Sequence, residues 1–527
     1  MPDVMPHEIA NAIMGKLYDI LTNGDEDVPK STDNFFSWNT PGTPCDPADF
    51  EFLAKGLTGV VTKAGAEAML AAVAVPAGGG GAAPTGLTDA QINQLRASDT
   101  ARLYAQAEQL ARWMDFVPDV NSVEDKLAPL SINADEGTLS EIYERTLRMS
   151  QVMESPLSDE QKKQIEHLRS LLVVTSKQKD IVTLEEIEVT EPSPLVKVYS
   201  EKMKAYDDAA LEYNVRRVDA LTGNDPEAIH FFGLNAKILR DKVRFAMDDW
   251  VGAGHKLDYE KVVAAIAAME ARDVTLLKRQ YLDDLDKAKL TGIASGSDFY
   301  YTQLIPASFA TSTGWSRFTF NSGHYANYQN SRFSSSGWEA HASAGFFGFG
   351  AHGGGRHDES RQEYNGSFNS DTFKLSFEIA QVPIVRPWLK SSFLVSKTWR
   401  FDPGNPDVKN DVLSDGGLPP KGLIPAYPTT AIFIRNLFMD VGHSDGFSSY
   451  MNQFSSSAQS GGGGFSFGPF SFGGGASHYT ANGETSRTFG FNWDGHGLSV
   501  PGMQLVGYRC HVLPKSPDPS PGITAWV

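Results

Sequence analysis

Cysteine is almost absent from this chain of 527 residues, which contains only Cys45 and Cys510. Two cysteines cannot form the disulfide framework typical of small secreted domains, and they are compatible with a reducing compartment. The N-terminus also lacks a basic segment followed by an apolar core and a cleavage site, so no secretory signal is expected. We therefore expect synthesis in the cytoplasm, with release by a non-classical route if the protein acts outside the cell.

Long apolar runs and basic clusters are missing as well. The longest apolar stretch, Ala68 to Ala77, is only about half as long as a transmembrane helix requires. The net charge is −18, and residues 291–527 hold only 16 acidic and 15 basic residues of the total, so residues 1–290 carry a net charge of −17. Binding to nucleic-acid phosphates needs clustered Lys and Arg, which neither half supplies. Nucleic acid is therefore not an expected partner.

Catalytic signatures are weak. The chain has no His-Glu-x-x-His motif and no Walker-type phosphate loop. The glycine pattern from Gly348 to Gly353 formally matches a dinucleotide fingerprint, but it lacks the strand-to-helix context that gives this fingerprint its meaning. No cofactor is expected, and an enzyme is the function with the least support.

Helical periodicity is the main feature of the N-terminal half. Apolar residues recur every four positions from Ile9 to Leu21, and capping patterns precede further helices at Thr88, Thr138 and Ser193-Pro194. Another helix is predicted from near Pro226 to Trp250, and a last one from Asp258 to Leu285. We predict a helical segment over residues 1–77, a glycine-rich linker over 78–86 and an acidic helical bundle over 87–292.

Landmarks that recur in the same order indicate a tandem duplication after residue 300. Leu304-Ile305-Pro306-Ala307 returns as Leu423-Ile424-Pro425-Ala426, and Gly323-His324 returns as Gly442-His443, both 119 residues later. Further pairs follow at nearly the same offset: Phe333-Ser334-Ser335-Ser336 with Phe454-Ser455-Ser456-Ser457, Gly353 to Gly355 with Gly473 to Gly475, Thr372-Phe373 with Thr488-Phe489, and Val382-Pro383 with Val500-Pro501. We predict two modules related by a pseudo-twofold axis, over residues 300–400 and 421–527, joined by a linker over 401–420.

Each module is predicted to be mainly antiparallel β-structure. Phe373, Leu375, Phe377 and Ile379 alternate with polar residues, as in a strand with one buried face, and Phe489, Phe491 and Trp493 are expected to repeat that strand. Ala431 to Phe438 is more continuously apolar, which favours a strand covered on both faces. The predicted fold class is therefore α+β, with several domains and with glycine- and phenylalanine-rich hairpins in the β modules.

Two stretches without formal charge are unusual for the surface of a protein. Residues 446–483 contain no Asp, Glu, Lys or Arg, and neither do residues 340–355 in the first module. A transmembrane β-strand needs ~9–11 uncharged residues of alternating character, which both stretches provide. An uncharged hairpin packed against another module or a neighbouring subunit fits the pattern too. The candidate membrane or assembly contacts are Phe346, Phe347, Phe349, Phe465, Phe467, Phe470 and Phe472.

Several histidines are candidate ligands. His324 and His443 are repeated by the duplication, which favours a structural role with a backbone partner, and ligand binding is the alternative. His352, His357 and Asp358 lie near a predicted hairpin tip, where imidazole and carboxylate groups could hold a divalent metal. A plain polar turn is the competing interpretation of that cluster.

These patterns lead to one main functional hypothesis and several alternatives. A helical bundle followed by β-rich modules is similar in layout to some insecticidal pore-forming toxins, although layout does not imply function. The main hypothesis is a non-enzymatic, oligomerising, membrane-active protein whose partners are copies of itself and a lipid membrane. The alternatives are a self-assembling structural protein, in which strand edges and aromatic hairpins associate between subunits, and a duplicated module that binds a carbohydrate or another small ligand.

Overall fold

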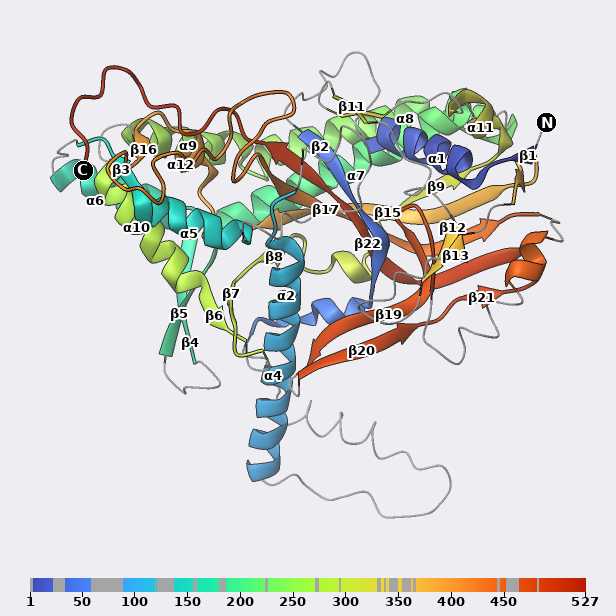
Figure 1. The fold of residues 1–527 in the computed structure, drawn as a ribbon, viewed down its shortest axis with the longest axis horizontal. Coiled ribbons are helices and arrows are strands. Elements are labelled where there is room, and N and C mark those ends of the chain that lie inside the picture. Colours follow the sequence, from blue (N-terminus) through green and yellow to red (C-terminus); the bar gives the residue numbers. More distant parts are fainter. Residues whose placement is uncertain are drawn as a thin grey trace.

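The computed structural model combines helices with antiparallel sheets, which confirms the α+β class (Figure 1). It describes residues 3–21, 34–57, 89–118, 120, 137–154, 159–179, 186–222, 226–270, 274–292, 295–328, 333–335, 338–340, 349–352, 362–363, 366–442, 446–451, 464–480 and 483–527. The predicted glycine-rich linker over 78–86 lies outside these residues. Among the described helices, none combines the length and apolar content needed to cross a lipid bilayer.

A long antiparallel sheet forms the centre of the molecule. Its strand order is β2-β22-β17-β15, with β2 at Asn34–Cys45, β22 at Gly497–Val512, β17 at Ala426–Asp440 and β15 at Lys374–Val385. Two short strands pair with the outer side of β15, namely β9 (Ser316–Phe320) and β8 (Gln303–Leu304). The short strand β21 (Asn492–Trp493) pairs with the beginning of β22.

The alternating pattern of β15 is confirmed. Leu375, Phe377 and Ile379 are buried, whereas Lys374 is exposed and Glu378 is partly exposed. Strand β17 is buried over most of its length, as its largely apolar sequence predicts.

The predicted strand through Phe489, Phe491 and Trp493 is wrong as one element. Phe489 ends strand β20, and Trp493 belongs to the separate strand β21. Glycines interrupt the pattern, because Gly490 separates the two strands and Gly495 adopts a φ of 99° in the turn before β22.

Two long segments each connect neighbouring antiparallel strands of the central sheet. The first connection, residues 321–373, leaves β9 and returns as β15, with Phe320 paired to Leu375. The second connection, residues 441–496, leaves β17 and returns as β22, with Asp440 paired to Gly497. Each pair of strands is therefore a β-hairpin with a very long loop.

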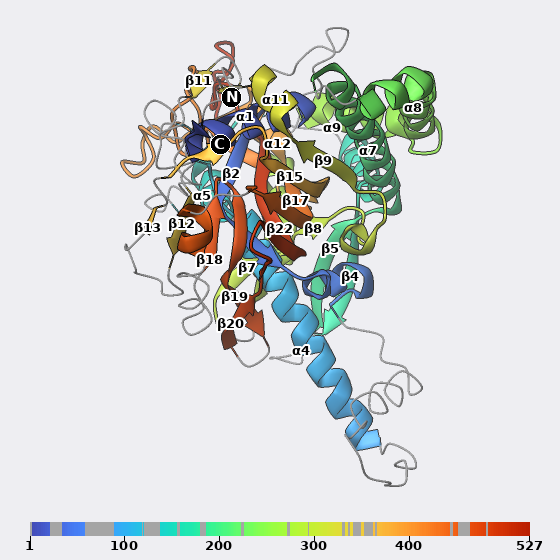
Figure 2. The same cartoon turned by 90° about the vertical axis from the view of Figure 1, so that its right-hand side faces the viewer.

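The two connections join to build a second antiparallel sheet. Its order is β13-β12-β18-β19-β20, in which the first connection supplies β12 (Phe349–His352) and β13 (Gln362–Glu363). The second connection supplies β18 (Gly464–Phe467), β19 (Phe470–Thr480) and β20 (Gly483–Phe489). Strands β12 and β18 pair directly, so the two glycine-rich stretches are neighbours in the fold (Figures 1 and 2).

The rest of the first connection folds as short elements. Helix α11 (Ser322–Tyr328) follows β9, and β10 (Phe333–Ser335) pairs with β11 (Trp338–Ala340). Strand β14 (Phe368–Asn369) pairs with β1 (Asp3–Val4) at the N-terminal end of the chain.

Strand β2 corrects the prediction of a helical segment over residues 1–77. It pairs along β22 from Asn34 opposite His511 to Cys45 opposite Met503, and so belongs to the central sheet. No clear strand pattern is visible here in the sequence, because Pro41, Gly42 and Pro44 interrupt it. A shift of register between Trp38 and Thr43 accommodates these residues.

The predicted helices of the N-terminal half are confirmed individually. They are α1 (Pro6–Leu21), α4 (Asp89–Met114), α5 (Leu139–Met149), α7 (Pro194–Thr222) and α8 (Pro226–Gly252). The Thr138 side chain accepts a hydrogen bond from the Glu141 N–H, which forms the predicted capping box of α5. The predicted last helix is instead two, α9 (Lys256–Glu270) and α10 (Val274–Ala288).

Short elements fill the remaining parts of this half. They are the 3₁₀-helix Pro47–Phe50, α2 (Glu51–Lys55), β3 (Ser150–Val152), α6 (Asp159–Ser170), the hairpin of β4 (Val173–Lys179) and β5 (Glu186–Pro192), and the hairpin of β6 (Lys289–Thr291) and β7 (Asp298–Tyr300). After β7 come the 3₁₀-helix Phe309–Thr311, α12 (Ser391–Val395) and β16 (Trp399–Phe401).

The helices cover the central sheet at several places. Helix α7 lies beside the edge strand β9 and pairs with α8 farther from the sheet (Figure 2). Helix α4 packs its C-terminal half into the core and projects its N-terminal half away from the sheets (Figure 1). One continuous core joins α1, the strands β15 and β17, and aromatic residues of both connections.

Candidate functional site

The β18–β19 hairpin of the second connection is the centre of the candidate site. Phe465 pairs with Phe472 and Phe467 pairs with Phe470 across a turn at Gly468 and Pro469. Gly468 adopts a φ of 58°, a left-handed conformation that glycine adopts without strain. Four of the seven predicted contact residues therefore lie on one tight hairpin.

Three of these phenylalanines point into the protein. Phe467, Phe470 and Phe472 are at most 1% exposed. The Phe470 ring lies 5.3 Å from the ring of Phe377 on β15, and the Phe467 ring lies 6.1 Å from that of Phe373. In this conformation they are core residues, so contact with a membrane or another subunit would require the hairpin to leave the sheet beneath it.

Polar contacts clamp the hairpin to the central sheet. The Gln504 side chain on β22 accepts a hydrogen bond from the Ser471 N–H at 2.8 Å and donates one to the Ser471 carbonyl at 2.5 Å. The N–H of Gly42 on β2 donates to the Pro469 carbonyl at 3.0 Å. A Cβ atom at position 42 would clash with this carbonyl, so glycine permits the close approach. We call these contacts the Gln504 clamp.

The other predicted contact residues are only partly described. Phe349 pairs with Phe467 through the backbones of β12 and β18, and Phe465 lies on β18, but only the backbones of Phe349 and Phe465 are described. Phe346 and Phe347 lie outside the described residues. The role of the seven phenylalanines as membrane or assembly contacts stays a prediction.

His324 holds the first connection through a buried cluster of charges. Its Nε2 lies 3.2 Å from Oδ1 of Asp219 on α7, and the same carboxylate oxygen lies 2.5 Å from Nζ of Lys16 on α1. The His324 ring stacks on Phe320 at 5.9 Å, and Lys16 lies 5.1 Å from the centre of the Phe318 ring. His324 thus has an acidic side chain as partner, in addition to the local backbone N–H of Asn321. We call Lys16, Asp219 and His324 the α11 latch.

Burial shapes the electrostatics of the latch. Burial lowers the pKa of Lys16 to about 8, although the charge of Asp219 and its hydrogen bond oppose this shift. Burial alone would raise the pKa of Asp219, but hydrogen bonds from His324 and Lys16 and the charge of Lys16 keep it below its ordinary value. A further bond from the Tyr328 hydroxyl to Asp19 at 2.7 Å ties the end of α11 to α1.

The predicted metal cluster cannot be placed. His357 and Asp358 lie outside the described residues, as does His443, and only the backbone of His352 is described, in β12. Elsewhere in the described part of the chain, no group of three or more His, Cys, Asp or Glu side chains is positioned to hold a metal ion.

Two Gly-x-Ser-x-Gly patterns, at 442–446 and 464–468, match the serine-hydrolase nucleophile motif. The second pattern forms β18 and its turn, which lacks the strand-to-helix context of that motif. The central residues of the first lie outside the described residues. Neither pattern therefore supports a catalytic serine.

A row of exposed apolar residues on α8 was also missed from the sequence. Phe231, Leu234, Ile238 and Phe245 are 41%, 68%, 65% and 63% exposed, although their spacing puts them on one face of the helix. Leu239, on a different face, is buried. The row could have been found by noting that α8 has apolar residues on two faces, of which only one can cover α7. We call these four residues the α8 apolar row.

Comparison of the chain with protein-family models, with curated proteins and with solved structures finds no match.

Proposed function

We propose that this protein is membrane-active and self-associating, and that it inserts the second connection into a lipid bilayer as an antiparallel β-hairpin. The observation that carries the proposal is that residues 446–483, which have no formal charge, lie within a connection between two adjacent antiparallel strands. If this connection leaves the second sheet, it can extend the ladder of β17 and β22 beyond the pair of Asp440 and Gly497. Its length exceeds the two strands of ~9–11 residues that a membrane hairpin requires.

The energetic cost of release supports a triggered process. Moving Phe467, Phe470 and Phe472 from the core into water would cost ~1.5–3 kcal/mol for each side chain. Burial of the same side chains in lipid would return a similar free energy. The net free-energy cost of moving the three phenylalanines from the protein core into lipid is therefore small. The Gln504 clamp must then be broken, and its polar groups must find new partners in the extended ladder.

The two connections are proposed to be equivalent parts of a tandem duplication. Each is enclosed by a pair of antiparallel neighbours, β9 with β15 and β17 with β22. This repeated arrangement agrees with the order of the sequence landmarks. The first connection would insert by the same route, although it carries more charged residues than the second.

A reversible cross-link between the connections tests the proposal. Gly350 and Ser466 are paired directly between β12 and β18. Directly paired residues in antiparallel strands have Cα atoms ~4.5–5.5 Å apart, a distance that a disulfide can span. The Gly350→Cys/Ser466→Cys variant, when oxidised, should not release dye from phosphatidylcholine vesicles with or without phosphatidylserine, and reduction should restore release.

A second cross-link provides the matched control. Lys374 and Asp440 are paired between β15 and β17, which remain neighbours in the proposed insertion. The Lys374→Cys/Asp440→Cys variant should release dye whether oxidised or reduced. The native Cys45 and Cys510 are buried and free, so they should not compete for oxidation. Equal release by the oxidised and reduced Gly350→Cys/Ser466→Cys protein, or no release by the wild type, would refute the proposal.

Self-assembly without membrane activity is the second candidate. The α8 apolar row supports it, because four large side chains lie exposed in one line, as in an unoccupied helix-packing face. Leu234→Glu/Ile238→Glu should then abolish concentration-dependent association in analytical ultracentrifugation. If association is lost but the wild type never releases vesicle contents, the second candidate replaces the first.

A further inference from the structure

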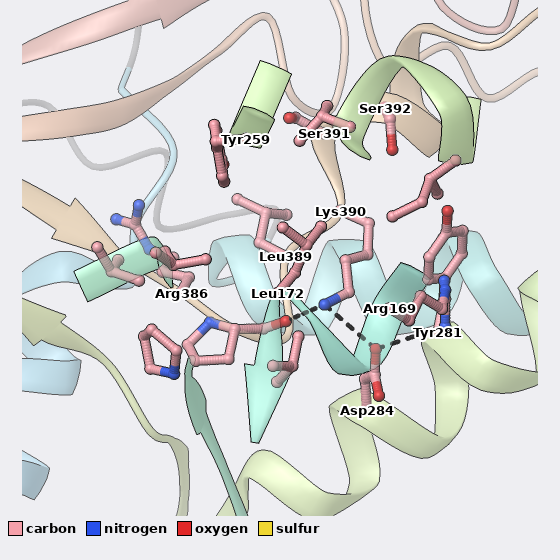
Figure 3. A pocket seen from close by; sticks show the side chains of 17 residues that line it. Arg169, Leu172, Tyr259, Tyr281, Asp284, Arg386, Leu389, Lys390, Ser391 and Ser392 are labelled. Atoms are coloured by element: carbon pink, nitrogen blue, oxygen red, sulfur yellow. Dashed lines mark hydrogen bonds and ion pairs between the residues drawn. The ribbon is translucent and has the colours of Figure 1, made fainter. Parts of the chain in front are cut away.

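A cavity of about 220 Å³ lies where the helical elements meet the end of strand β15 (Figure 3). Helices α6, α7, α9 and α10 and strands β4 and β5 contribute to its wall. Val385 at the end of β15 and several residues between 386 and 392 complete it. No residue that lines the cavity belongs to either connection, and the cavity plays no part in the proposed insertion.

Most of the wall is apolar. Leu172, Val196, Val263, Ile266 and Leu389 line it, and the rings of Tyr259 and Tyr281 add aromatic surface. Ile266 and Tyr281 are buried. A ligand that fills this cavity therefore needs a compact apolar body.

The wall of the cavity contains more cationic than anionic side chains. Arg169, Arg386 and Lys390 are cationic, and Asp284 is the one carboxylate among the lining residues. Nζ of Lys390 lies 3.2 Å from Oδ2 of Asp284, and the Arg169 guanidinium lies 3.7 Å from the same oxygen (Figure 3). Two cations thus converge on one carboxylate, and their side chains are only 18% and 15% exposed.

Arg386 adds a third positive charge to the wall. Its two terminal nitrogens donate to the carbonyls of Pro428 and Met114, both at 2.6 Å, and the charge of Asp115, which does not line the cavity, partly compensates it. In a site with little water, an excess of positive charge attracts an anion more strongly than it would in solution. The Arg169 guanidinium is also fixed on the Tyr281 ring, at 4.4 Å from its centroid, which preorganises one donor.

We propose that this cavity binds a small monocarboxylate with a compact apolar body. The carboxylate accepts hydrogen bonds from Lys390 and Arg169 beside Asp284, and the body lies against Leu172, Ile266 and Leu389. The size follows from the volume: the cavity is smaller than the ~300–1,000 Å³ of sites for drug-sized ligands. At the packing density of a protein interior, a ligand atom other than hydrogen occupies roughly 20 Å³, so about ten such atoms fill the cavity. A straight chain of about eight carbons, such as octanoate, is therefore a suitable probe.

Titration calorimetry with three probes of equal length tests the charge requirement in the wild-type chain. Octanoate should bind at one site per chain, octan-1-ol should bind at least about ten-fold more weakly, and octylammonium should not bind. Equal affinity for octanoate and octan-1-ol would overturn the proposal, as would the absence of octanoate binding.

Two substitutions with opposite expected signs separate a binding role from a structural one. Lys390→Met should weaken octanoate binding about ten-fold or more, whereas Asp284→Asn should strengthen it, because a competing carboxylate charge is removed. Lys397→Met is the matched control, since Lys397 is exposed and outside the cavity, and it should leave affinity unchanged.

Ile266→Trp should block binding by filling the cavity. Unfolding curves identify any variant that fails to fold, and for such a variant the comparison of probes in the wild type decides. Weaker binding in both Lys390→Met and Asp284→Asn, or unchanged binding in Lys390→Met, would overturn the assignment.

Discussion

The two connections are enclosed by similar pairs of strands, but different forces hold them. Charged groups hold the start of the first connection, through the α11 latch and the bond from Tyr328 to Asp19. Buried phenylalanines and uncharged hydrogen bonds of the Gln504 clamp hold the second. The difference matches their composition, since residues 446–483 contain no formal charge and the first connection contains several charged residues.

This contrast shows that two connections in similar positions can be held by contacts that respond to different solution conditions. A buried ion pair depends on protonation, and removing one partner leaves the other charge without compensation. Apolar packing and neutral hydrogen bonds do not depend on pH in that way. If the connections are released during function, the first should be sensitive to pH and to single charge changes, and the second to changes in packing.

The largest effect on stability is expected from a charge placed on the buried face of the second connection. Phe467 is fully buried, so Phe467→Asp both creates a cavity and buries a carboxylate. We expect a loss of at least about 4 kcal/mol in the free energy of unfolding, measured in urea. This variant therefore reports on folding and cannot isolate a membrane role.

Phe245→Asp is the control for that substitution. Phe245 is exposed on α8, so the change should alter the free energy of unfolding by less than about 0.5 kcal/mol. If Phe467→Asp were as well tolerated as Phe245→Asp, the packing of the β18–β19 hairpin against the central sheet would be wrong.

The burial of Phe467 also marks the limit of what the sequence could predict. The α+β class, the individual long helices and the alternation of β15 followed from periodicity, because each depends on residues close in sequence. The uncharged stretches of both connections could be identified as unusual. Their pairing through β12 and β18 could not, since strand pairing between distant segments has no local signature.

The latch shows a similar limit. His324 could be singled out by its repetition in the sequence, but its partners come from α1 and α7, more than one hundred residues away in the chain. Lys16 looks like an ordinary surface lysine on an amphipathic helix, yet its side chain is fully buried. A buried charge can only be recognised once tertiary packing is known. Strand β2 was missed for a different reason, because its prolines and glycine are typical of loops.

The second-largest effect should come from breaking the α11 latch. Asp219→Asn leaves the ammonium of Lys16 buried without a counter-charge, which should cost about 3–5 kcal/mol. Hydrogen exchange should increase in α11, whereas the β18–β19 hairpin should stay protected. Asp241→Asn is the matched control, because Asp241 forms ion pairs with Lys237 and Arg244, which are exposed on α8. This substitution should change the free energy of unfolding by less than about 1 kcal/mol. Equal loss of protection in both connections would mean that they open as one unit.

A smaller effect is expected from the Gln504 clamp. Gln504→Leu preserves most of the side-chain volume but leaves the N–H and carbonyl of Ser471 without these partners. We expect a loss of about 2 kcal/mol. Hydrogen exchange should now increase in β18 and β19 and remain unchanged in α11, the reverse of the result for Asp219→Asn. Faster dye release by Gln504→Leu would further link clamp opening to membrane activity.

The smallest effect concerns alkaline pH and distinguishes the two kinds of anchor. The pKa of Lys16 is lowered to about 8 in the folded chain, from 10.5 when it is exposed. Between these values the unfolded chain binds more protons than the folded one, so the contribution of Lys16 to stability rises with pH. This sign is opposite to the loss expected for a lysine whose pKa is raised by its partner.

The rise can be measured against Lys16→Met, which lacks the titrating group. From pH 7.5 to pH 9, the free energy of unfolding of the wild type should increase by about 1 kcal/mol relative to Lys16→Met. The difference between the wild type and Gln504→Leu should stay constant over the same range, because the clamp contains no titratable group. A decrease in the free energy of unfolding relative to Lys16→Met would mean that ion pairing with Asp219 affects the pKa of Lys16 more strongly than burial does. A pH-dependent difference for Gln504→Leu would mean that the two anchors are coupled, and the contrast between the connections would then fail.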